Sequence, residues 1–160
     1  MELTSIDYAE FMRLVAYKYY KILLNKTQIN KLLFIVYGNF LSKQNHKLFN
    51  DDTPKAWPYG PVFPIVNKKI DIERTPSPLP EEKVKLFMQN TKALDIIIEV
   101  VEKYHNCSAF KLTSWSHQKN SPWYDTLFKD GEENNIKWNK EISDDLIKDY
   151  FLRWHGDINQ

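Results

Sequence analysis

Residues 28–43, QINKLLFIVYGNFLSK, carry the strongest hydrophobic periodicity in the chain. Apolar side chains recur there at steps of three and four residues, at positions 29, 32, 33, 36, 37, 40 and 41. This spacing is typical of an α-helix with a wide buried face. We therefore predict a helix from about Gln28 to Lys43, with Thr27 as its N-cap.

The flanking sequence predicts further short elements. A second helical pattern runs from Ser5 to Leu24, and the short connection between the two helices favours an antiparallel pair. The pieces 48–49 and 55–57 flank the turn-forming residues 50–54, which suits a small hairpin or a compact loop. Since proline is well placed in the first turn of a helix, Pro61 predicts a short helix that continues through Val66.

The second half of the chain is also predicted to be mainly helical. Three prolines make 74–80 an extended loop, and a helix follows from about 81 or 83 to 104, with an interruption near 89–91. Ser108 and Ser121 are placed to cap two short helices, and a last helix starts at Ser143 and runs to Trp154. Residues 136–138 are expected to add a strand to the hairpin. The fold class is mainly α (α+β): a compact bundle of six or seven helices with a small hairpin or short antiparallel sheet.

Length and composition favour one globular domain over residues 1–160. The chain has 160 residues, of which 42% are hydrophobic and 27% are charged, and its net charge is +1. The longest apolar run, residues 32–37, is too short to cross a bilayer, and no signal sequence is evident at the N-terminus. We therefore expect no membrane insertion. Cys107 is the single cysteine, which suits a reducing compartment, so a cytoplasmic location is expected.

Patterns that would carry catalysis, a metal or a cofactor are weak. His105, Cys107 and His117 do not have the spacing of a structural zinc site. The four glycines of the chain do not cluster into a phosphate-binding loop. We therefore expect no catalytic residues, no metal and no cofactor.

Two segments place large aromatic side chains among rigid turns: residues 56–64, AWPYGPVFP, and residues 112–123, LTSWSHQKNSPW. Ordered aromatic anchors lose little entropy on binding, so such segments suit an interface with another protein. The alternative is that Trp57 and Trp123 simply fill the core, and that His117 fixes a loop. The candidate partner-binding residues are Trp57, Tyr59, Gly60, Pro61, His117, Pro122 and Trp123.

Three blocks of the sequence, in order, resemble the Panacea-domain family, which comprises SocA-like and GepA-like, phage-associated antitoxins. The first block is 28–38, with Leu32, Leu33, Phe34 and Tyr37 as its structural core. The second runs from Leu48-Phe49 through AWPYGPV to Pro64, and the third is 112–123. The resembling region spans about residues 12–152.

The resemblance implies an antitoxin that neutralises a protein toxin encoded by a neighbouring gene, by direct contact and in some members by delivery to a protease. Two other functions stay open at this point. A hydrolase would use His117 as its base, with Ser114, Ser116 or Cys107 as the nucleophile. A nucleic-acid-binding regulator of a phage or mobile element, which the charge distribution makes unlikely, would use lysines 31, 43, 47, 55, 68 and 69.

Overall fold

The computed structural model describes residues 2–128 and 135–158. Within these ranges the chain forms eight helices and a three-stranded antiparallel sheet of order β2-β1-β3, which confirms the predicted fold class with one more helix than expected. The elements are α1 (Ser5–Tyr20), α2 (Lys26–Gln44), β1 (Lys55–Trp57), β2 (Gly60–Val62), α3 (Pro64–Lys69), α4 (Glu81–Gln89), α5 (Thr91–Tyr104), α6 (Ala109–Ser116), α7 (Pro122–Phe128), β3 (Lys140–Glu141) and α8 (Asp144–Arg153).

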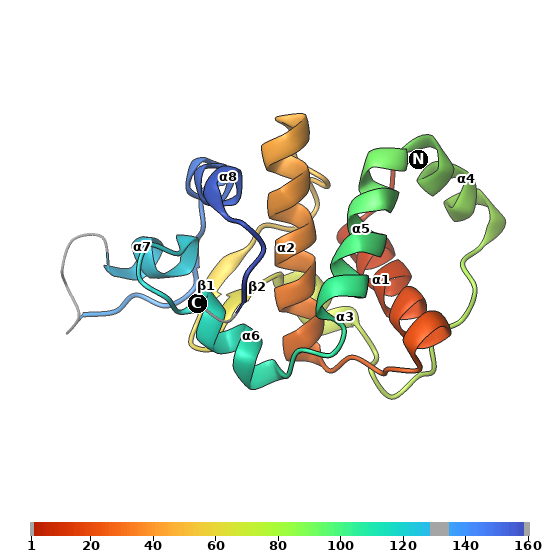
Figure 1. Cartoon of the computed structure of the whole chain (residues 1–160), viewed down its shortest axis with the longest axis horizontal. Coiled ribbons are helices and arrows are strands. Elements are labelled where there is room, and N and C mark those ends of the chain that lie inside the picture. The colour runs from red at the N-terminus through yellow and green to blue at the C-terminus, as the bar shows by residue number, and fades with distance from the viewer. Residues whose placement is uncertain (1, 129–134, 159–160) are drawn as a thin grey trace.

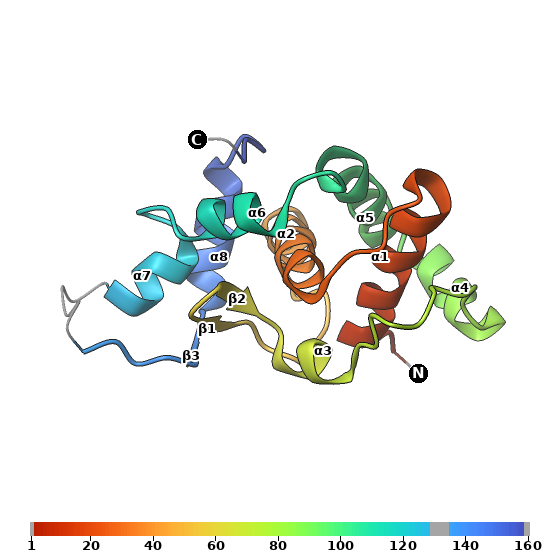
Figure 2. The ribbon, with the colours of Figure 1, turned by 90° about the horizontal axis from the view of Figure 1, so that it is seen from below.

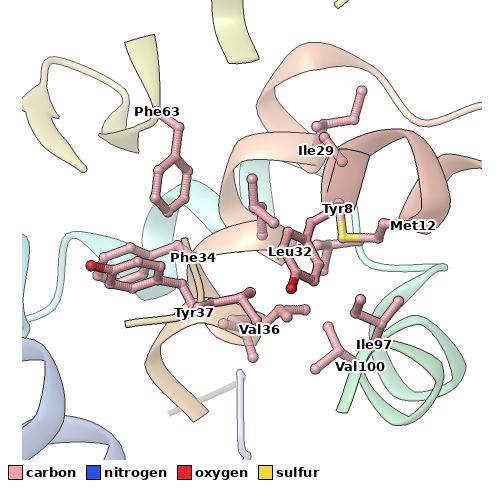
Figure 3. Close-up of a cluster of buried hydrophobic side chains, with 14 of the residues drawn as sticks. Tyr8, Met12, Ile29, Leu32, Phe34, Val36, Tyr37, Phe63, Ile97 and Val100 are labelled. Atoms are coloured by element: carbon pink, nitrogen blue, oxygen red, sulfur yellow. The ribbon is translucent and has the colours of Figure 1, made fainter. Parts of the chain in front are cut away.

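Helix α2 runs through the middle of the molecule. Figure 1 shows α1 and α5 on one side of it and α6, α8 and the sheet on the other. Because neighbours surround the helix, all ten residues from 29 to 38 are buried. Figure 3 shows side chains of α1 and α5 packed around Leu32 and Val36. The buried side chains of the chain form one connected cluster around α2.

The first two helices are confirmed, with corrections to their ends and their packing. Helix α1 ends at Tyr20, because Lys21 adopts a left-handed conformation with φ of 58°. Helix α2 begins at Lys26, and its N-cap is Asn25, whose side chain accepts a hydrogen bond from the Gln28 N–H. Figure 2 shows α2 end-on while α1 lies across the view, so the two helices cross and do not form an antiparallel pair.

The predicted helix at Pro61 is wrong, since residues 60–62 form β2. Strand β1 pairs antiparallel with β2, and Trp57 lies opposite Gly60, so the hairpin turns at Pro58-Tyr59 and not at 50–54. Helix α3 starts three residues later, at Pro64. Residues 50–54 form a loop, which was the other alternative, and in it Asp52 accepts hydrogen bonds from the backbone N–H groups at 65 and 66, at 3.0 and 3.1 Å. A carboxylate from this loop therefore caps a helix that lacks a side-chain cap of its own.

The third strand lies at Lys140–Glu141 and not at the predicted 136–138, which precede it as irregular backbone and a turn. Asn139 sits in the left-handed region, with φ of 70°, and turns the chain into the strand. The remaining helices are confirmed: the interruption falls at Asn90, which caps α5, and serines 108 and 143 cap α6 and α8. Among residues 2–128 and 135–158, no helix combines the length and apolar character that crossing a bilayer requires.

Candidate functional site: an aromatic corner above a buried lysine

The two aromatic segments predicted from the sequence meet in space, and together they form what we call the aromatic corner (residues 57–64 and 117–123). The indole Nε1–H of Trp123 donates a hydrogen bond to the Trp57 carbonyl at 2.7 Å. The His117 ring stacks on the Trp123 ring, with 3.8 Å between centroids and 9° between planes. These contacts fix the hairpin to the segment that joins α6 and α7.

Further hydrogen bonds hold both segments in place. The Trp57 Nε1–H donates to Asn139 Oδ1 at 2.9 Å, and the Asn139 N–H donates to the Ala56 carbonyl at 2.8 Å. In the other segment, Ser121 Oγ donates to the Ser116 carbonyl at 2.8 Å and accepts from the Tyr124 N–H at 3.1 Å. The aromatic corner is therefore a braced structure and not a pair of free loops.

A lysine of α2 lies beneath the hairpin. Lys31 is only 1% exposed, and its Nζ donates to the Pro61 carbonyl at 3.3 Å. Within the described residues no carboxylate forms an ion pair with it. Burial lowers the pKa of the Lys31 ammonium from 10.5 to about 8.

Gly60 allows the hairpin to close over this lysine. Its φ is +112°, a conformation that favours glycine, and a Cβ at this position would lie 2.5 Å from Ser116 Oγ and 2.8 Å from Lys31 Cε. The hairpin backbone thus packs directly on the lysine stem and on the end of α6.

Beside Lys31 the structure has a pocket of about 270 Å³. Apolar side chains of the hairpin, Trp57, Tyr59 and Val62, form part of its wall, and Thr27 and Asn30 of α2 form another part. A second hollow, of about 320 Å³, lies between α2, α5 and the C-terminal segment. In that second hollow Lys103 pairs with Glu99 at 2.8 Å, whereas Lys31 has no ion pair among the described residues.

The surroundings of His117 do not resemble those of a catalytic base. Burial and the nearby charge of Lys31 lower its pKa, against a smaller opposite effect of the Pro58 backbone, so the imidazole is neutral at pH 7. Its Nε2 has no hydrogen-bond partner among the described residues. Ser116 Oγ donates instead to the Thr113 carbonyl at 2.9 Å, and burial raises the pKa of the Cys107 thiol. No hydroxyl or thiol of the described chain is therefore placed for His117 to activate.

Metal binding is not supported by the arrangement of side chains either. In the part of the chain that the structure describes, no three histidine, cysteine, aspartate or glutamate side chains gather where they could hold an ion.

The candidate partner-binding residues divide into exposed and buried members. Tyr59, at the tip of the hairpin, is 72% exposed, and Trp57 and His117 are partly exposed. The other four, which are Gly60, Pro61, Pro122 and Trp123, are buried and support the corner from within. The core residues of the first block, which are Leu32, Leu33, Phe34 and Tyr37, are all buried in α2.

Sequence reasoning missed three residues of this site. Lys31 was grouped with the lysines of a nucleic-acid interface, although it directly precedes the apolar run 32–37. Asn139 bonds Trp57 from a segment 82 residues away, and no local pattern indicates such a contact. Trp138 is 45% exposed and lies 6.5 Å from Trp123 between ring centroids, so it extends the aromatic surface.

Fold and site together define a mainly helical protein with a rigid aromatic corner built on a small sheet, in whose described residues no nucleophile is bonded to His117. Residues 29–124 match the family described as Antitoxin SocA-like, Panacea domain, and the chain belongs to this family. The matched range runs from Ile29 in α2 to Tyr124 in α7, so α1 and α8, which both contact α2, lie outside it. Neither curated proteins nor solved structures give a match to the chain.

We expect His117 to act mainly on stability. His117→Ala should lower the free energy of unfolding by about 1–2 kcal/mol, because it removes the stack on Trp123 and leaves a small cavity. Binding of the protein partner that we propose below, per folded molecule, should change less than the melting temperature. A wild-type melting temperature together with a loss of partner binding in this variant would contradict the expectation.

Proposed function

We propose that the protein is an antitoxin that neutralises a protein toxin, encoded by a neighbouring gene, by binding it directly through the aromatic corner. The observation that carries the proposal is Tyr59, an aromatic side chain 72% exposed at the tip of a braced two-residue turn. An aromatic anchor that is already ordered loses little entropy when a partner packs against it. The family to which the chain belongs supports the same function.

In this proposal the protein acts in the cytoplasm as a binding protein and not as an enzyme. The isolated position of His117 supports this view, because a hydrolase would need a nucleophile beside it. Two of the six lysines that the nucleic-acid alternative would use are not free to contact phosphates. Lys31 is buried, and Lys47 forms an ion pair with Asp144 at 3.6 Å. We do not propose it as a second function.

Co-expression with the neighbouring gene tests the proposal. The neighbouring gene product alone should stop growth, and growth should recover when this protein is present. The two proteins should also co-purify as a complex. A harmless neighbour, or a toxin that stays toxic and unbound, would contradict the proposal.

The proposal includes delivery of the toxin to a protease as a second mode of neutralisation. Its test is the half-life of the toxin in cells, with and without this protein. Adaptor activity predicts a shorter toxin half-life in the presence of this protein. An unchanged or longer half-life would mean that the protein neutralises the toxin by binding and not by delivery to a protease.

Tyr59 should matter for binding and not for folding. Tyr59→Ala should weaken toxin binding at least tenfold, about 1.4 kcal/mol, because it removes the exposed anchor. The melting temperature should stay near the wild-type value, since the side chain is mostly in solvent. Tyr19→Ala is the matched control, because Tyr19 is 68% exposed on α1, outside the aromatic corner. Equal binding by wild type and Tyr59→Ala, in titration calorimetry, would place the contact elsewhere.

A further inference from the structure

No described residue neutralises the charge of Lys31. An ammonium has three hydrogen-bond donors, and among the described residues Lys31 forms a single hydrogen bond, to the Pro61 carbonyl at 3.3 Å. The polar neighbours in the pocket are neutral, and Asn30 is already engaged: its Oδ1 accepts from the Phe63 N–H at 2.9 Å, and its Nδ2 donates to the Lys26 carbonyl. Within the described residues, nothing therefore neutralises this cation.

A buried cation of this kind is costly to a protein unless an anion joins it. Lysine is almost never fully buried without a partner, because its desolvation opposes folding. Here that desolvation has already occurred when the free protein folds. An anion that enters the pocket gains the attraction without any further desolvation of the lysine, so the site is preorganised for it.

The pocket has the chemistry to receive a carboxylate. It opens at the first turns of α2, where the positive end of the helix dipole favours negative charge. On another side it is lined by Asn67, which Lys68 and Lys69 follow as exposed cations. Its volume of about 270 Å³ accommodates a side chain, and a partner side chain that fills it against Trp57 and Val62 would displace the water around a charge pair.

We infer that this pocket receives an aspartate or glutamate side chain of the polypeptide partner, whose carboxylate pairs with the Lys31 ammonium. The inference rests on the proposed function, because Tyr59 is both a wall of the pocket and the exposed anchor of the aromatic corner. Partner residues that pack on Tyr59 would bring their acidic neighbour to the lysine. Tyr59 supplies contact area, and Lys31 selects a partner with an acid at the matching position.

Binding of the neighbouring gene product to Lys31→Met tests the inference. Methionine keeps the length of the stem and removes the charge. The affinity of the Lys31→Met variant for the toxin should fall at least about 30-fold, as expected when one member of a buried charge pair is removed. Lys85→Met is the matched control, because Lys85 is exposed on α4 and should bind as wild type does. Both variants are to be checked by thermal melting, so that a folding defect is not read as lost binding.

Acidic residues of the toxin complete a double-mutant cycle. One Asp→Asn or Glu→Gln substitution in the toxin should lower the affinity for wild type at least about tenfold and barely affect the affinity for Lys31→Met. If Lys31→Met binds like wild type, or if no acidic residue couples to it, the inference is wrong and the proposed function stands. If wild type does not bind the neighbouring product at all, the proposed function fails and the inference fails with it. Binding of duplex DNA that is steeply salt-dependent and requires Lys31 would instead assign the pocket to a phosphate and overturn the carboxylate.

Discussion

Gly38→Ala should lower the free energy of unfolding by about 3 kcal/mol, although the same substitution in the middle of an exposed helix would stabilise it by about 1 kcal/mol. The reason is the contact between α2 and α8. A Cβ at position 38 would lie 2.1 Å from two carbon atoms of the Phe151 ring, far inside van der Waals contact. Urea unfolding monitored by circular dichroism measures the change.

The Phe151 ring cannot move aside easily. It packs edge-on against Phe34, with 5.7 Å between centroids, and against Trp154, with 5.4 Å. Added volume in such a core forces side chains from their preferred rotamers or separates the helices. The methyl group must therefore either displace α8 or leave the protein partly unfolded.

A second substitution provides the control for Gly38→Ala. Phe151→Leu removes the ring that the new methyl group would meet. The double variant should therefore lose less free energy of unfolding than the two single variants lose together. Simple additivity, or a stabilised Gly38→Ala protein, would show that α2 and α8 do not approach each other at this point.

The helices could be predicted because their apolar residues recur locally. The break at Asn90 and the serine caps of α6 and α8 could also be predicted from local sequence, because capping depends on side chains within a few residues. The hairpin was misplaced because Pro61 fits a helix start as well as an edge strand. Its register depends on the Gly60 conformation and on packing over Lys31, and neither is a local signal.

The aromatic corner could be predicted only in part. The turn-rich aromatic segments are visible in the sequence, and the structure brings them together through Trp123 and the Trp57 carbonyl. The burial of Asn30 and Lys31 could not be foreseen, because polar residues in a helix ordinarily mark its solvent face. Here they face the hairpin, where the Phe63 N–H and the Pro61 carbonyl bond to them. The available signal was a polar pair placed between Ile29 and the apolar run 32–37.

Lys31 should make the stability of the free protein depend on pH above neutrality. Its folded-state pKa, about 8, lies below its ordinary value of 10.5. Between these two values the unfolded chain binds the proton and the folded protein does not, so stability rises as the pH increases from 8 towards 10.5. At pH 7 both states are protonated, and the burial of the charge costs about 3 kcal/mol. The charge of Lys31 in turn contributes to lowering the pKa of His117, which is neutral throughout this range.

Lys31→Met should therefore raise the free energy of unfolding at pH 7 by about 1–2 kcal/mol. This gain is smaller than the cost of burying the charge, because the Pro61 carbonyl loses its hydrogen bond. The advantage over wild type should shrink between pH 8 and 10, in urea unfolding measured across that range. Comparing the two proteins at each pH cancels the effects of buried tyrosines such as Tyr104 and Tyr150, whose pKa values burial raises to about 12. A variant that is less stable than wild type at pH 7, by a margin independent of pH, would mean that the lysine serves to tie α2 to the hairpin. The increase in stability together with the loss of toxin affinity is the combination expected of a charge held in the core for a partner.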